Sequence, residues 1–285
     1  MLQEFAYISP NNSKELCEIL KKHQRRAKIL AGGTDLLVDI RAGKNVPSFL
    51  VDLKNIPELK KIELTKEGLS IGAAVTCSEV INNGLVQKQF PLIADAAIQI
   101  GSPQVRNRAT VIGNICTSSP SADMAPVLLC LGAFLKIDSF NSTRNVDLKD
   151  FFTGVKKNVL KEFEVVSQLI IPASMAKVSG GFEKLKRVKG HDLALASAAM
   201  VKRGNSLRLA IGACATTPIV LPDFPQTTPV EKVKKMAIKA VRPIDDVRAS
   251  KDYRMFMIQV QIERLMVKIL DQEFSLGFEM KLEDC

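Results

Sequence analysis

The chain has 285 residues, of which 46% are hydrophobic and 25% charged, so we expect a globular protein with two domains. Its longest apolar run, residues 124–135, is too short to cross a bilayer, and no membrane helix is expected. The net charge of +10 is spread along the chain, which has only two Tyr and no Trp to stack on bases, and this favours an anionic cofactor or an acidic partner over nucleic acid.

The first residues, M-L-Q-E-F-A-Y-I-S-P, lack the basic start and apolar core of a secretory signal, so we expect the protein in the cytoplasm. The six cysteines lie far apart and form no C-x-x-C pair, which argues against a zinc or iron–sulfur site in this chain. We expect them to be mostly buried free thiols. Two histidines, His23 and His191, are too few for a histidine-rich metal site.

Helix and strand patterns alternate through the first hundred residues. Asn12 is placed to cap a helix with Glu15 at its third position, and Leu16, Ile19 and Leu20 then share one face. The patterns that follow are a strand at 28–30, a glycine turn at 31–35, a helix at 36–40, a strand at 49–53, a hairpin of 61–64 and 69–73 around T-K-E-G, and a helix at 91–100.

The second half continues this mixture. The small polar segment 174–181 is the best candidate for a domain boundary. We expect an apolar helix at 125–131, strands at 134–137 and 165–171, a hairpin of 192–201 and 206–214 around R-G-N, and a final helix with Ile258, Ile262, Leu265 and Ile269 on one stripe.

A glycine pair follows the first strand. In A-G-G-T-D, Gly32 and Gly33 permit backbone conformations in which successive amides point into one concavity, and the next helix adds its positive end, as in a diphosphate cradle. For an isolated glycine pair, a plain strand-to-helix turn capped by Thr34 or Asp35 is the commoner explanation. The sequence contains neither a G-x-G-x-x-G fingerprint nor a P-loop.

A second segment of small residues, T-V-I-G-N-I-C-T-S-S-P-S-A-D at 110–123, has hardly a charge, although solvated loops usually carry Lys or Glu. Backbone that touches a ligand closely is built from Gly, Ser, Thr and Asn, so we interpret this segment as a loop that a ligand covers. Two such segments are able to clamp one long ligand from both sides.

The paired segments resemble the FAD-binding subunit of molybdenum hydroxylases, a family that includes xanthine, carbon monoxide and nicotinate dehydrogenases. The resemblance rests first on A-G-G-T-D-L-L together with I-G-S-P-Q-V-R-N-R-A-T-V-I-G-N and S-S-P-S-A-D. Further segments agree and extend the likeness over residues 1–270: F-A-Y-I-S-P, K-G-H-D-L-A-L-A-S-A-A-M, and R-L-A-I-G-A-C-A-T-T-P-I followed by D-D-V-R-A-S-K-D-Y-R.

The resemblance implies an α+β fold of two domains. The first is a two-subdomain FAD-binding domain of the vanillyl-alcohol-oxidase/PCMH type at residues 1–175, with subdomains 1–57 and 58–175 and FAD between them. The second is a smaller α/β C-terminal domain at residues 176–285.

The resemblance also implies a set of FAD-binding residues. Amides of the first glycine loop would hold the pyrophosphate, residues 110–114 would close over the cofactor, and the acid at position 123 would bind the adenosine side. No residue is assigned as a catalytic acid or base, or as a metal ligand. The implied set is Ile29, Leu30, Ala31, Gly32, Gly33, Thr34, Asp35, Leu36, Ile100, Thr110, Val111, Ile112, Gly113, Asn114, Asp123, Val166 and Lys184.

Some of these positions leave alternatives open. The family usually has T-I-G-G-N, and Ile112 replaces the first of those glycines, so its side chain either narrows the space beside the cofactor or points outward. Cys116 is either a thiol near the isoalloxazine or a small apolar filler. Lys184 is either a solvated strand charge or a cation near the pyrimidine end of the flavin, where it would stabilise the reduced, anionic form. His191 is expected to be a structural or surface residue.

The function implied by the resemblance is an electron relay. A molybdopterin-binding large subunit hydroxylates a substrate, 2Fe-2S clusters in a small subunit pass the electrons on, and FAD in this chain delivers them to NAD+ or another acceptor. One alternative is a non-catalytic assembly subunit that has lost FAD through Ile112. Another is a different flavoenzyme of the same fold that acts alone, which the matching C-terminal segments disfavour.

Overall fold

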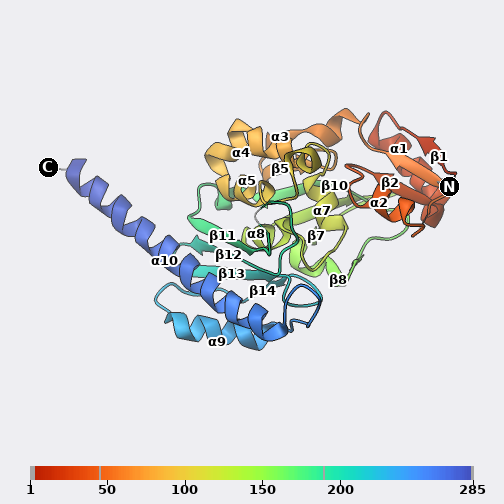
Figure 1. Ribbon diagram of the computed structural model, residues 1–285. Helices are drawn as coiled ribbons and strands as arrows, with labels where there is room; N and C mark the ends of the chain where they lie inside the picture. Colours follow the sequence, from red (N-terminus) through yellow and green to blue (C-terminus); the bar gives the residue numbers. More distant parts are fainter. Residues whose placement is uncertain (1–3, 45, 189, 284–285) are drawn as a thin grey trace.

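The computed structural model describes residues 4–44, 46–188 and 190–283, and most of its strands belong to three sheets (Figure 1). The first sheet is parallel, with strand order β1-β3-β2. Its strands are β1 (Ala6–Ile8), β2 (Ala27–Leu30) and β3 (Phe49–Asp52), joined through the helices α1 (Ser13–His23) and α2 (Leu36–Arg41).

The second sheet is antiparallel, with strand order β4-β5-β10-β6-β7. The hairpins β4–β5 and β6–β7 lie on either side of β10, so the last strand in sequence occupies the centre. The strands are β4 (Ile62–Leu64), β5 (Gly68–Gly72), β6 (Phe134–Asp138), β7 (Thr143–Asp147) and β10 (Val165–Pro172).

The main hydrophobic core lies where the second sheet meets the helices that connect β5 to β6. Alternate residues of the strands, among them Leu69, Ile71, Leu135 and Leu169, are completely buried in it. The helices are α3 (Cys77–Asn82), α4 (Gly84–Gln89), α5 (Pro91–Ala97), α6 (Pro103–Arg106), α7 (Val111–Cys116) and α8 (Met124–Cys130).

A two-stranded hairpin lies outside these sheets. It consists of β8 (Phe152–Gly154) and β9 (Lys157–Asn158) and comes before β10 in the sequence. Four single 3-10 turns complete this part of the chain, at Gln24–Arg26, Pro57–Lys60, Leu148–Asp150 and Ala173–Met175.

The third sheet belongs to the C-terminal part of the chain and has the order β11-β12-β13-β14, with β15 also paired to β13. Figure 1 shows the helix α10 lying along this sheet beside α9. The elements are β11 (Gly180–Leu185), β12 (Ala196–Arg203), β13 (Ser206–Gly212), β14 (Ile219–Val220), β15 (Phe224–Pro225), α9 (Val230–Ala240) and α10 (Lys251–Glu283).

Most of the expected elements are present. Asn12 caps α1 by accepting the Glu15 amide at 2.9 Å, and both predicted hairpins form. The stripe Ile258, Ile262, Leu265 and Ile269 on α10 is completely buried against the third sheet, as the helical spacing predicted. The α+β fold class is confirmed, whereas the division near residue 175 stays a prediction.

Three predicted elements need correction. The segment at 110–116 is not a loop, because Thr110 caps the short helix α7. The helix expected at 91–100 ends at Ala97, since the chain then turns through Gly101, which has a φ of +45°. The strand expected from residue 192 begins at Ala196, because Asp192 is held in a turn by the Arg187 amide at 3.2 Å.

The cysteines and histidine follow the expectation where the structure describes them. Four thiols are buried and Cys116 is half-buried, while Cys285 lies outside the described residues. His191 is exposed. Within the described ranges, no helix combines the length and the apolar character needed to cross a membrane.

Candidate cofactor site

The glycine turn between β2 and α2 presents a row of free backbone amides. Gly33 has a φ of +75°, in the left-handed region that favours glycine. The amides at positions 32–36 donate no hydrogen bond to any residue that the structure describes. Asp35 occupies the cap position of α2, but its side chain accepts no hydrogen bond from the helix. A plain capped turn therefore does not account for this segment, and its amides are available to an anion.

The contribution expected from the helix itself is smaller than predicted. The helix α2 has six residues, so it adds only a weak dipole to the turn. A side chain at position 33 would meet leucines of β2 and α2. A Cβ there would lie 2.8 Å from Leu30 Cδ1 and 3.1 Å from Leu37 Cδ1, so it would point at these leucines rather than at a bound phosphate.

Gly32 packs against the backbone that immediately precedes the second small-residue segment. A Cβ on Gly32 would lie 2.1 Å from the carbonyl oxygen of Arg108 and 2.8 Å from Ala109 Cα, distances that no side chain tolerates. The Thr117 hydroxyl donates to Gly113 O at 3.0 Å, and its oxygen lies 3.4 Å from Asp35 Oδ2 of the glycine turn. Residues about eighty positions apart in the sequence thus lie side by side.

The second segment is a capped helical turn. The Thr110 hydroxyl accepts the Gly113 amide at 3.0 Å, and a Cβ on Gly113 would lie only 2.6 Å from that oxygen. Glycine at position 113 therefore permits the cap. Ile112 is 4% exposed and packs into the main core, so its side chain neither reaches solvent nor fills the surface between the two segments.

Asn114 ties α7 to the acid at position 123. Its Oδ1 accepts the Met124 amide at 3.2 Å, which holds the start of α8 against α7. Asp123, immediately before α8, is thereby kept beside the residues of the second segment. Val111 has its side chain in the core and contributes only backbone to this surface.

Asp123 and Lys184 form a buried ion pair. Lys184 Nζ lies 2.7 Å from Asp123 Oδ2, and the two side chains are 1% and 9% exposed. The other carboxylate oxygen, Asp123 Oδ1, is buried and has no hydrogen-bond partner among the described residues. Burial raises the pKa of Asp123 to about 6, against the opposing charge of Lys184. Lys184 is therefore not a solvated strand charge.

The pairing bears on the roles predicted for these two residues. One was placed at the adenosine and the other at the pyrimidine end of the flavin, which are opposite ends of an extended FAD molecule. Side chains 2.7 Å apart cannot serve both ends. The polar atom left over, Asp123 Oδ1, fits a ligand that brings its own N–H or O–H donor.

The segment between α7 and α8 is held in a strained conformation. Ser118 is 1% exposed and has a φ of +50°, which is uncommon for a residue other than glycine. Asn158 Nδ2 donates to Ser118 Oγ at 3.1 Å and to Cys116 O at 3.0 Å. Burial raises the pKa of the Cys116 thiol to about 12, which favours the thiol over the reactive thiolate.

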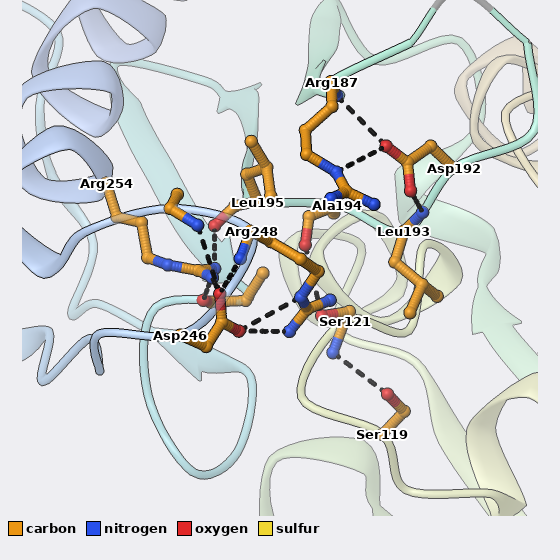
Figure 2. Close-up of polar contacts among 12 residues, drawn as sticks. Ser119, Ser121, Arg187, Asp192, Leu193, Ala194, Leu195, Asp246, Arg248 and Arg254 are labelled. Carbon is orange, nitrogen blue, oxygen red and sulfur yellow. Dashed lines mark hydrogen bonds and ion pairs between the residues drawn. The ribbon is translucent and has the colours of Figure 1, made fainter.

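The C-terminal segments that carried the resemblance meet at Arg254, which is 2% exposed (Figure 2). Its guanidinium donates to Leu195 O at 2.5 Å and to Asp246 Oδ1 at 2.8 Å, and it reaches Ala213 O at 3.4 Å. The segment so held supports the small-residue loop, since the Ser121 hydroxyl donates to Ala194 O at 3.3 Å.

The remaining predicted residues lie around this surface without polar roles of their own. Ile100 is 7% exposed and Val166 is 2% exposed, and both side chains belong to the main core. Val166 lies next to an irregularity in the pairing of β10 with β6. Thr34 is half-buried in the glycine turn. Ile29 and Leu30 form the end of β2, and Ala31 follows them.

Sequence reasoning missed several residues that shape the site. Gln99 accepts Lys184 Nζ on its backbone carbonyl at 3.0 Å, and Arg106 contacts the same turn. Any residue type offers a backbone carbonyl, so the sequence could not identify Gln99 as a contact of Lys184. Asn158 had only the weak signal of a polar residue next to a turn.

The arrangement fits FAD. Free amides on a glycine turn suit a diphosphate, and a buried carboxylate oxygen without a partner suits an aromatic ring system that carries an N–H donor. Contacts through Gly32, Asn114 and Lys184 connect the segments that carry these two features.

Comparison with known proteins points to the same cofactor. Residues 3–174 match the family described as the FAD binding domain in molybdopterin dehydrogenase. The chain is 31% identical to the carbon monoxide dehydrogenase medium chain of Hydrogenophaga pseudoflava, over 92% of this chain and 96% of that one. It is 32% identical to a putative xanthine dehydrogenase FAD-binding subunit of Escherichia coli, over 85% and 88%. Among solved structures, the carbon monoxide dehydrogenase of Hydrogenophaga pseudoflava superimposes with a TM-score of 0.88 over 95% of this chain and 99% of that chain, at 30% identity.

Proposed function

The chain belongs to the family of FAD-binding domains of molybdopterin dehydrogenases, the FAD subunits of molybdenum hydroxylases, and we propose that it is the electron-transfer subunit of such a complex. Its partners would be a molybdopterin-binding large subunit, which hydroxylates the substrate, and a small subunit whose 2Fe-2S clusters supply electrons. NAD+ or another acceptor would receive them. The observation that carries the proposal is the joined surface of free amides and a half-satisfied buried carboxylate.

Each part of the surface has a role in this proposal. Bound FAD supplies a group that takes up and releases two electrons. The amides at positions 32–36 would hold its pyrophosphate, and α7 would cover it from the other side. We assign both Asp123 and Lys184 to the pyrimidine end of the flavin, where Asp123 Oδ1 accepts an N–H and the lysine charge favours the reduced, anionic form.

We also propose the division into an FAD-binding domain at 1–175, with subdomains 1–57 and 58–175, and a C-terminal domain at 176–285. The arrangement of the strands supports it, because the first two sheets end at Pro172 and the third begins at Gly180. The FAD would then lie between the subdomains, where Gly32 meets Ala109. A cytoplasmic location stays a prediction from the sequence.

The burial of Ile112 favours this proposal over a subunit that has lost its cofactor. The alternative needs a side chain at position 112 that closes the space beside the cofactor. Ile112 packs into the core instead, and Gly113 keeps the glycine that the cap of α7 needs.

We expect the purified chain to hold one FAD without a covalent bond. No histidine lies within either small-residue segment to attach the flavin, and the contacts available are hydrogen bonds and charge. Precipitation with acid should release the flavin into the supernatant, where its absorbance is measured. Flavin that stays on the precipitated polypeptide would show a covalent link.

FAD affinity should fall in mild acid. In the chain without FAD, burial raises the pKa of the Asp123 carboxyl to about 6. A hydrogen-bond donor from bound FAD should lower that pKa by stabilising the carboxylate. Protons therefore compete with FAD below pH 6, and the Kd should be about tenfold higher at pH 5 than at pH 7.5. Fluorescence titration at the two pH values measures this ratio. The variant Asp123→Asn should lose the pH dependence, and an unchanged ratio in that variant would assign the effect to another group.

The proposed assembly is tested by co-purification of the tagged chain from its native cell. We expect two partners: a larger subunit that carries molybdopterin and a smaller subunit that carries iron–sulfur clusters. If the net charge of +10 steers their docking, association should weaken as salt rises. Recovery of a free chain that already oxidises small substrates would instead favour a flavoenzyme that acts alone.

A further inference from the structure

The turn at residues 98–101, between α5 and α6, presents three of its four backbone carbonyls to one guanidinium. Nη1 of Arg106 lies 3.1 Å from Ile98 O, 3.0 Å from Ile100 O and 3.2 Å from Gly101 O. Carbonyl oxygens that converge in this way carry like partial charges, so they need a cation between them to stay together. Arg106 therefore holds the shape of the turn.

The remaining carbonyl of the turn holds the buried lysine. Lys184 Nζ donates to Gln99 O at 3.0 Å and to Asp123 Oδ2 at 2.7 Å. The side chain of Gln99 is held as well, because its Oε1 accepts Lys186 Nζ at 3.3 Å. The position of the lysine ammonium on Asp123 thus depends on where the turn places the carbonyl of Gln99.

We propose that Arg106 is a positioning residue for the cofactor, because by holding the turn at 98–101 it keeps Lys184 on one oxygen of Asp123 and leaves Asp123 Oδ1 to the ligand. The effect on the ion pair concerns this chain alone. The effect on the flavin rests on the proposed function.

The ion pair is tested first, in the chain without FAD. Arg106→Met keeps the aliphatic stem and removes the donors, and Arg108→Met is the matched control, because the Arg108 side chain is exposed and makes no hydrogen bond to a described residue. Lysine acylation followed by mass spectrometry measures the access of reagent to Lys184, with the 59% exposed Lys149 as internal reference. We expect Lys184 to react about tenfold faster in Arg106→Met, since charged hydrogen bonds are lost, and at the wild-type rate in Arg108→Met.

The flavin is tested next, in the reconstituted chain. Arg106→Met should bind FAD about tenfold more weakly and shift the flavin midpoint potential to a more negative value, because the lysine charge is no longer held in place. Arg106→Lys should restore part of the FAD affinity and part of the midpoint potential. An ammonium supplies the positive charge but not the planar, forked donors of the guanidinium. A merely structural role would lower thermal stability without moving the potential.

Each result decides the question. If Lys184 is acylated at the wild-type rate in folded Arg106→Met, the inference is overturned, regardless of the FAD affinity and midpoint potential of the variant. If Arg106→Met does not fold, Arg106→Lys takes its place: an intermediate rate supports the inference and a wild-type rate overturns it. If the wild-type chain binds no FAD at all, the proposed function fails, and the acylation rates still decide the role of Arg106.

Discussion

Replacing Gly32 with alanine is expected to abolish FAD binding. The added Cβ would lie 2.1 Å from the carbonyl oxygen of Arg108 and 2.8 Å from Ala109 Cα, and these are backbone atoms that cannot rotate away. The two segments must therefore separate, and the free amides of the glycine turn lose their position relative to α7. Several charge-assisted hydrogen bonds of about 1.5–3 kcal/mol each depend on that position. The flavin content of the purified variant, read from its visible spectrum, measures the loss.

Two variants define how specific this effect is. Gly84→Ala is the matched control, because nothing lies within 4 Å of the added Cβ, and it should keep full flavin content. Gly33→Val should also lose FAD, through the strain of a β-branched residue at a φ of +75°. Normal flavin content in Gly32→Ala would mean that the contact between the segments does not form the site.

Lys184→Met should destabilise the protein without FAD by about 3 kcal/mol at pH 8. The substitution leaves Asp123 buried without its counter-ion, and breaking a buried pair costs more than the pair itself contributes. Urea denaturation of the apo chain measures the change. Lys149→Met is the control, since the Lys149–Asp147 pair is 3.8 Å apart and more than half exposed on both sides, and it should change stability by less than about 0.5 kcal/mol.

The penalty should depend on pH in a defined direction. The pKa of Asp123 is already raised to about 6 from its ordinary 3.8, and loss of the lysine raises it further. A carboxyl with a raised folded-state pKa supports the native state fully below its unfolded-state pKa and loses that support as pH rises through the folded-state value. The cost of Lys184→Met should therefore be small at pH 4 and should grow as pH rises above about 6. An equal cost at both pH values would show that the charge of Asp123 is not its cause.

The fold was largely predictable because its periodicities are strong. Asn12 with Glu15, the T-K-E-G turn between β4 and β5, and the stripe of Ile258 and Ile269 are local patterns that tertiary packing did not override. The helix α7 escaped prediction because its six residues include Gly113 and Asn114, which favour turns. Its stability comes from the Thr110 cap and from the burial of Ile112 in the core, which local propensity does not reveal.

The candidate site was predictable in its backbone but not in its charges. The glycine pair and the small-residue segment carry a compositional signal, and the structure packs Gly32 against Arg108 and Ala109, immediately before that segment. The pairing of Asp123 with Lys184 joins residues 61 positions apart, and nothing local to either residue predicts it. Resemblance to a family placed both residues in the site, whereas their pairing is known only from the structure.

The location of FAD is tested most directly by NMR of the chain labelled with 15N-glycine, because only 16 glycine amides give signals. On titration with FAD, we predict that the signals of Gly32, Gly33 and Gly113 move together and saturate at one FAD per chain. The signals of Gly43, Gly84 and Gly204, where a Cβ would meet nothing within 4 Å, should stay in place. Saturable binding that leaves Gly32 and Gly33 unmoved would contradict the site described here.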